Sequence, residues 1–328
     1  MNRFFLILAL LFCIIFTSGQ KNVKRYYDYI NKAELVICDF KYERASQYYE
    51  KAFHAITPFC NDLFNATILN VKFTKKYDLA LNYSRQLLQK DFEIGWVYRL
   101  IDSKDSLIAL KFKSLEDTVK SQTNKNLKLI LEEMLEKDQK EATTPQEKYE
   151  KCLVHHTNFI KLFELTKEYG TLTEQIVGIY EYSPIHIILV HAAQAQMSPQ
   201  ELLLQDVLNG KIYAENYIKY YDLYLENVGK PTRFGYGWNP IFISNDILFI
   251  VHPDNINKTN NERNKINIAE TWEDYVKKAK YQFLNNNFQL FTRVNVMQDE
   301  EEVKKMMQEI DEEHQKGIYK REYVIRKK

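Results

Sequence analysis

Two copies of one pattern near the N-terminus constrain the fold of this 328-residue chain more than any other feature. The copies, 35 residues apart, read Tyr42-x-x-Ala45-x-x-Tyr48-Tyr49 and Tyr77-x-x-Ala80-x-x-Tyr83. An interval of this length is typical of repeated pairs of antiparallel helices. A small residue at the contact lets the second helix of a pair approach the first, while the tyrosines cover the seam. The chain also has only 9 glycines and 7 prolines, so we predict a mainly α fold that begins with two helical hairpins.

This pattern resembles the tetratricopeptide repeat family over residues 26 to about 92. The matching positions are Ala33, Tyr42, Ala45, Tyr49, Ala52 and Pro58. The second copy departs from the family pattern at Ile68 and Ser84. Residues 95–116 lack the signature, and we expect a divergent capping pair there. The resemblance implies a concave surface that binds peptides.

The repeat tyrosines are the candidate binding residues. A peptide-binding surface would be formed by Tyr26, Tyr29, Tyr48, Tyr49 and Tyr83. The alternative is that these rings pack in the seam between helices and send only their hydroxyl groups to water.

The first 19 residues have the pattern of an export signal. Arg3 precedes the apolar run Phe4–Phe16, and small residues follow at Thr17-Ser18-Gly19, as a signal peptidase requires. The run is shorter than the roughly 20 residues that span a bilayer, and no later stretch approaches that length. We therefore predict cleavage before Gln20, an exported periplasmic or extracellular protein, and no stable membrane span in the mature chain.

Charge and cysteine content exclude several classes. The chain has 45 Lys plus Arg against 44 Asp plus Glu, so no basic field indicates a nucleic-acid partner. Beyond the export signal the cysteines are Cys38, Cys60 and Cys152, too few for a disulfide scaffold. Either Cys38 pairs with Cys60, or all three are unpaired.

Helical periodicity continues through the middle of the chain. We predict helices over residues 118–143, 146–169, 185–195, 199–208 and 214–227, which together form an all-α bundle. Residues 127–238 resemble a bacterial family of unknown function. The matching residues are Asp138-Gln139, Asn158, Gly170, Gly178, His191-Ala192, Asp222 and Gly229-x-Pro231-x-x-Phe234-Gly235. The chain departs from that family at Ala142, Val190, Leu223 and Thr232. The resemblance implies a related fold and an exported bacterial protein, and it brings no known activity.

One set of residues has the composition of an acid–base or metal site. His191 with Asp222 and Asp138 would supply an imidazole oriented by a carboxylate. The alternative is a buried histidine that holds neighbouring helices in register. His186 and His191 lie about 140° apart on a helix, His155 and His156 also diverge, and no phosphate loop or nucleophile motif occurs. We therefore expect no metal and no cofactor.

After residue 238 the pattern changes. We predict a strand hairpin over 241–251 turning at Asn245-Asp246, a loop over 254–267, a helix over 272–284, a strand over 288–297 and a charged helix over 299–316. The charged helix either packs on the repeat domain or docks on a partner.

These observations divide the chain into a signal peptide (1–19), a helical-repeat domain (20–117), a helical domain of unknown function (118–238) and a small α+β extension (239–328). The leading hypothesis is an exported, non-enzymatic protein that binds a protein or peptide through its repeats. The alternative is a hydrolase or metal-dependent enzyme centred on His191 with Asp222.

Overall fold

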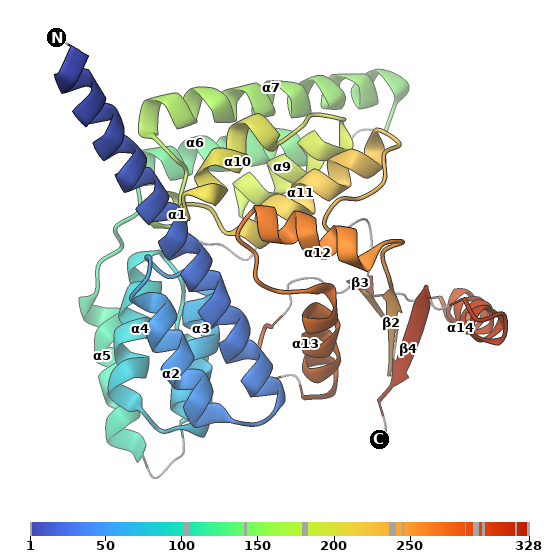
Figure 1. Ribbon diagram of the computed structural model, residues 1–328, viewed down its shortest axis with the longest axis horizontal. Coiled ribbons are helices and arrows are strands. Elements are labelled where there is room, and N and C mark those ends of the chain that lie inside the picture. Colours follow the sequence, from blue (N-terminus) through green and yellow to red (C-terminus); the bar gives the residue numbers. More distant parts are fainter. Residues whose placement is uncertain are drawn as a thin grey trace.

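A computed structural model shows a mainly α-helical protein with a small sheet near the C-terminus, as the sequence predicts (Figure 1). The structure describes residues 2–101, 105–140, 143–178, 183–235, 241–244, 246–285, 287–290, 295–296, 299–318 and 320–326. Side chains are described from residue 19 onwards, outside the short strands β1 and β3.

The N-terminal part consists of two helical hairpins. The first pairs α1 (Asn2–Cys38) with α2 (Tyr42–Phe53), and the second pairs α3 (Cys60–Ile68), continued by the π-turn η1 (Leu69–Phe73), with α4 (Tyr77–Gln89). Helices α2 and α4 begin on the first tyrosine of each repeat copy, and Ala45 and Ala80 are fully buried. The predicted hairpins are therefore confirmed, while membership of the tetratricopeptide family stays a prediction. The short helix η2 (Gly95–Leu100) and helix α5 (Ser106–Thr118) follow, where the capping pair is predicted.

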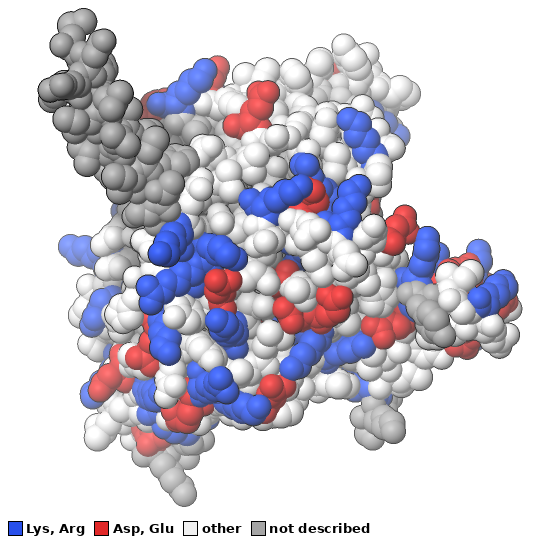
Figure 2. Space-filling view, viewed as in Figure 1, with Lys and Arg blue, Asp and Glu red and all other residues white. Residues whose placement is uncertain are grey.

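Charges of both signs are interspersed over the face drawn in Figure 2, and basic side chains gather over α1 and α2. Among the described residues, no helix has the length and apolar character needed to cross a membrane. The predicted export signal falls almost wholly on residues whose side chains are not described. Export therefore stays a prediction. Cys38, Cys60 and Cys152 are all free, so Cys38 and Cys60 form no disulfide.

Among the described residues, six helices form the central bundle, and all except α8 lie close to a predicted range. They are α6 (Lys125–Gln139), α7 (Pro145–Tyr169), α8 (Glu174–Val177), α9 (Pro184–Gln194), α10 (Gln200–Leu208) and α11 (Ala214–Asn227). The first begins at Lys125 rather than near 118, because the Asn124 side chain accepts a hydrogen bond from the Leu127 N–H and caps the new helix. Helix α9 contacts α6, α7 and α11 and is the centre of the bundle.

The hairpins and the central bundle share one hydrophobic core. The Tyr27 hydroxyl accepts a 2.9 Å hydrogen bond from the Ala214 N–H, and the Tyr27 and Tyr213 rings stack with centroids 6.3 Å apart. Gly210 has a φ of +69°, and a Cβ there would lie 2.7 Å from Val23. The boundary predicted near residue 118 is thus crossed by continuous packing.

The C-terminal sheet has strand order β3-β1-β2-β4, from β1 (Ile241–Ser244), β2 (Ile247–Val251), β3 (Asn295–Val296) and β4 (Arg321–Ile325). Strands β1 and β2 pair antiparallel with Ser244 opposite Ile247, which confirms the predicted hairpin. Of the strand predicted over 288–297, only β3 is observed among the described residues, and 291–294 and 297 lie outside them.

Helix α14 (Glu300–Gln315) packs on this sheet, with Val303 and Ile310 buried against Phe249. Its prediction as a helix is confirmed. Its predicted place on the repeat domain is wrong, because its narrow apolar stripe matches the face of β2 and β4 that carries Ile247, Phe249 and Tyr323.

The loop predicted over 254–267 is also wrong, since it contains helix α12 (Ile256–Lys265). The Asn255 side chain caps this helix by accepting a 2.9 Å hydrogen bond from the Lys258 N–H. Arg263 is fully buried within it. The segment has no apolar stripe, so buried polar contacts rather than periodicity decide its conformation.

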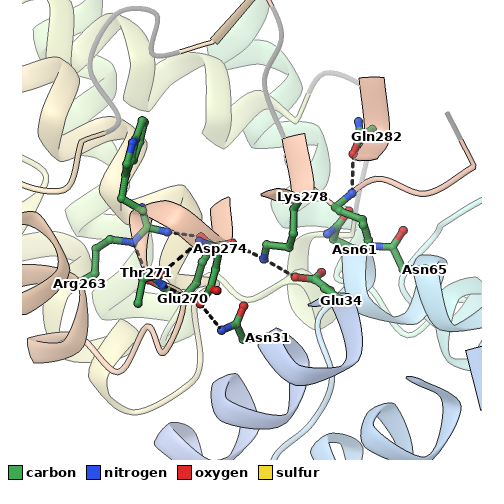
Figure 3. A network of polar contacts seen from close by, with 12 residues as sticks. Asn31, Glu34, Asn61, Asn65, Arg263, Glu270, Thr271, Asp274, Lys278 and Gln282 are labelled. Carbon is green, nitrogen blue, oxygen red and sulfur yellow. Dashed lines mark hydrogen bonds and ion pairs between the residues drawn. The ribbon is translucent and has the colours of Figure 1, made fainter. Parts of the chain in front are cut away.

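A buried ionic network joins the C-terminal extension to the first hairpin (Figure 3). Lys278 of α13 (Trp272–Asn285) donates to Glu34 of α1 at 2.5 Å and also contacts Glu270. Glu270 in turn pairs with Arg263 of α12. Lys278, Glu34 and Arg263 are at most 2% exposed. Four charged side chains from three segments are therefore removed from water together.

We expect Lys278→Met to lower the free energy of unfolding by about 3–5 kcal/mol, because it leaves Glu34 and Glu270 buried without their shared cation. The adjacent Lys277 bonds Asp39 at 2.7 Å at the surface, with its side chain 47% exposed. Lys277→Met is the matched control and should cost about 0–1 kcal/mol. Urea unfolding of the three proteins checks this. Equal losses in the two variants would contradict the structural role of Lys278.

Burial raises the pKa of Glu34 from 4.5 to about 7, with Lys278 opposing the shift and Glu215 and Glu270 adding to it. Between these values the folded protein keeps a proton that the unfolded chain has lost. The contribution of Glu34 to stability is thus complete below pH 4.5 and is lost as the pH rises through 7. We expect Glu34→Gln to flatten the fall in stability between pH 5 and 7, measured by urea unfolding, and the exposed control Asp254→Asn to leave it unchanged. Identical slopes for Glu34→Gln and wild type would refute this.

Candidate functional site

Three helices of the central bundle bring a carboxylate and two imidazoles together. Asp138 lies in the last turn of α6, His155 in α7 and His191 in α9. The His191 Nδ1 and Asp138 Oδ2 atoms are hydrogen-bonded, and His155 Nε2 lies 3.7 Å from Asp138 Oδ1. The two imidazole rings stack with centroids 4.8 Å apart. One donor atom from each of the three side chains lies within 4.8 Å of the others.

The cluster is buried on its carboxylate side and partly exposed on its histidine side. The Asp138 side chain has no exposed surface, whereas those of His155 and His191 are 14% and 22% exposed. Burial acts to raise the pKa of Asp138, but the hydrogen bond and charge of His191 outweigh it and hold that pKa below 3.8. Burial lowers the pKa of His155 more than Asp138 raises it. At neutral pH an ionised carboxylate therefore faces an uncharged His155.

Two amides fix the position of the carboxylate. Gln139 Nε2 donates to Asp138 Oδ2 at 3.0 Å. Asn158 Nδ2 donates to the Met134 carbonyl at 3.1 Å and lies 3.5 Å from Asp138 Oδ1. Asn158 is one turn beyond His155 on α7, so both side chains face α6. Asp138, Asn158 and His191 are also among the positions on which the predicted resemblance to a bacterial family rests.

The structure keeps part of the predicted constellation and changes the rest. His191 and Asp138 meet, as the sequence suggested. Asp222 is elsewhere: its carboxylate accepts hydrogen bonds from the backbone N–H groups of Arg233 at 2.8 Å and Phe234 at 3.0 Å. Asp222 thus stabilises the turn after α11 by accepting these backbone hydrogen bonds. Its predicted pairing with His191 is not observed.

The sequence does not single out His155, because His155 and His156 diverge on one helix and cannot bind one ion together. The structure uses only one histidine from each of two helices. The available signal was the spacing of His155 and Asn158 by three residues, which places them on one face of α7.

The predicted binding tyrosines divide into two groups. Tyr26, Tyr49 and Tyr83 are at most 4% exposed and belong to the core, so their prediction as surface residues is wrong. The small residues at the helix contacts leave room for these rings in the seam between the helices. Tyr29 and Tyr48 are half-buried and stack with centroids 6.2 Å apart.

Cations surround this stacked pair. Lys51 lies within 6.0 Å of both ring centroids, and Arg25, Lys32 and Arg44 each lie over one of the two rings. Cation–π contacts of this kind account for the partial burial of the two tyrosines.

A separate hollow of about 260 Å³ lies between α7, α9, α10 and α11. Its wall includes His186, whose Nδ1 lies 2.7 Å from the Tyr220 hydroxyl. His186 and His191 therefore lie in different surroundings, as their spacing on one helix predicts.

Comparison of the chain with models of protein families, with curated proteins and with solved structures gave no match. The two family resemblances therefore stay predictions. The case for a functional site rests on the geometry of Asp138, His155 and His191.

We expect Asp222→Ala to lower the free energy of unfolding by about 1–3 kcal/mol, because two backbone N–H groups lose their hydrogen-bond acceptor. Asp222→Asn keeps one acceptor oxygen and should lose less. The NMR signals of the His191 ring should not move in either variant. A shift of the His191 signals as large as that caused by Asp138→Asn would show that Asp222 belongs to the cluster.

Proposed function

We propose that this protein binds a divalent transition-metal ion, of which Zn²⁺ is the best fit, through Asp138, His155 and His191. The observation that carries the proposal is the convergence of three donor atoms from three different helices within 4.8 Å. The three residues come from different helices, so their positions in the sequence alone do not bring them together. It requires α6, α7 and α9 to pack in one particular arrangement.

The donor set suits zinc. Two imidazole nitrogens and one carboxylate oxygen are common zinc ligands, with bonds of about 2.0–2.2 Å. Donors around one such ion lie roughly 3–4 Å apart, so the side chains need to move by about 1 Å. His155 Nε2 is buried and has no hydrogen-bond partner among the described residues. A metal bond would satisfy this atom.

Three protein ligands leave a coordination position open, which is the arrangement of catalytic rather than structural zinc sites. A bound ion would act there as a Lewis acid toward a carbonyl or phosphoryl oxygen. Because the two histidines are partly exposed, this open position would lie on the side nearer to solvent. This supports the alternative that the sequence suggested, with His155 in place of Asp222.

Peptide binding through the repeats, the leading hypothesis from the sequence, stays a prediction. The first helix of each hairpin is already covered by the chain itself. Helix α13 packs on α1, and residues 288–290 pack on α3. An external peptide on this face would have to displace part of the C-terminal extension.

The metal proposal is tested by titrating metal-free protein with ZnCl₂ in a calorimeter at pH 7.5. We expect one site in the wild type and at least tenfold weaker binding in His155→Ala, because one of three ligands is lost. His156→Ala is the matched control, since the adjacent His156 is exposed and takes no part in the cluster. Zinc at about 100 times its Kd should also stabilise the wild type by about 2.7 kcal/mol, and chelation with EDTA should remove that gain.

Equal zinc affinity in His155→Ala and His156→Ala would exclude the cluster as the binding site. Absence of saturable binding by the wild type would exclude the proposal altogether.

A further inference from the structure

The hollow between α7, α9, α10 and α11 takes no part in the proposed metal site. Its volume is about 260 Å³, and the four helices lie together in the upper part of Figure 1. Protein interiors are close-packed, and few of their voids are larger than a water molecule. One water occupies roughly 30 Å³ in the liquid, so this hollow has room for a small molecule.

The wall of the hollow is mainly apolar. Aliphatic side chains enter it from three of the helices: Leu162 from α7, Ile185 and Leu189 from α9, and Leu202 and Leu203 from α10. Cavities with such walls bind apolar molecules, and one of roughly 150 Å³ is large enough for benzene. By proportion, a hollow of about 260 Å³ holds a molecule of roughly ten non-hydrogen atoms.

The acidic and lysine residues in the wall are Glu174, Asp206, Lys211 and Lys219. Glu174 pairs with the buried Lys90 at 3.6 Å, and Asp206 pairs with Lys211 at 3.4 Å. Burial raises the pKa of Glu215, and the charge of nearby Lys219 opposes that rise. Each of the four charges thus has an oppositely charged neighbour in the protein. A charged ligand would lose its water without gaining a partner, so the wall favours an uncharged one.

Asn216 of α11 supplies a polar group to this wall. It is half-buried, and its side-chain amide forms no hydrogen bond to any described residue. Buried polar groups generally have hydrogen-bond partners, and an amide can both donate and accept. Tyr220 lies one turn further along the same face of α11, where its hydroxyl contacts His186 Nδ1 at 2.7 Å. The polar atoms of the wall therefore gather beside α11, opposite the leucines of α7 and α10.

We propose that this hollow binds a small, uncharged, mainly apolar molecule of roughly ten non-hydrogen atoms that carries one hydroxyl or carbonyl group. Burial of the apolar part against the leucines supplies most of the affinity. The hydrogen bond between the single polar group and Asn216 orients the molecule. This inference is independent of the metal site, because none of the three proposed metal ligands lines the hollow.

The test is a fluorescence titration of the full chain with 2-naphthol at pH 7.5, where this two-ring alcohol is uncharged. We expect saturable binding to one site in the wild type. Ile185→Trp fills the hollow and should weaken binding at least tenfold. Ile187→Trp is the matched control, because Ile187 is half-buried on the same helix and does not line the hollow. Its affinity for 2-naphthol should equal that of the wild type.

Two further ligands test the chemistry of recognition. Asn216→Leu should weaken the binding of 2-naphthol at least threefold, because a hydrogen bond is lost. The same variant should bind naphthalene, which has no hydroxyl group, as well as the wild type does. The anion 2-naphthoate should bind the wild type at least tenfold more weakly than 2-naphthol, since the wall offers no unpaired cation.

Absence of saturable 2-naphthol binding by the wild type would overturn the proposal. Equal affinity in Ile185→Trp and Ile187→Trp, both with wild-type helical circular dichroism, would place the ligand elsewhere and also overturn it. Should Ile185→Trp lose its helical signal, Leu202→Trp fills the hollow from α10, with the half-buried Leu204→Trp as its control. Binding of 2-naphthoate as tight as that of 2-naphthol would refute the uncharged class of ligand, and equal loss of naphthalene and 2-naphthol in Asn216→Leu would refute the role of Asn216.

Discussion

The arrangement of the whole chain depends on the buried ammonium group of Lys278. It neutralises Glu34 of the first helix and Glu270 of the C-terminal extension, and Glu270 in turn holds Arg263 of α12. Moving such charges out of water is costly, and the cost is offset only when every partner is in place. The network therefore favours one register of α13 along α1. A shift of α13 along α1 would separate Lys278 from Glu34.

The position of α13 also determines where the residues after it lie. With α13 fixed on α1, the following residues run along α3 and place Phe288 and Gln289 against Asn65. The hairpins thus bind a peptide segment, but it is their own. The cluster of Asp138, His155 and His191 lies apart from this contact, among α6, α7 and α9. The molecule consequently combines a self-occupied hairpin surface with a separate polar cluster in the central bundle.

Sequence reasoning located most helices because their apolar periodicity and end signals are local. Gly170 ends α7 with a φ of +79°, and Tyr42 and Tyr77 begin α2 and α4. It failed where long-range contacts decide. Helix α12 has no apolar stripe and is stabilised by the buried Arg263, whose partners include the distant Phe234 carbonyl at 3.3 Å. Likewise the repeat pattern predicts Tyr26 as a binding residue, although the ring is fully buried and its hydroxyl contacts the buried Asp62.

The sequence by itself determined the mainly α fold, the two hairpins and the presence of His191 and Asp138 on helices of one bundle. Periodicity and capping carry that information, since both act within a few residues along the chain. Only the tertiary structure decided which polar groups meet. In the folded protein His155 lies beside His191 and Asp138, and the Asp222 carboxylate accepts hydrogen bonds from the backbone after α11. The Gln289 backbone is hydrogen-bonded to Asn65. These partners are 11 to 224 residues apart in the sequence, and packing of the helices brings them together, which no local sequence pattern encodes.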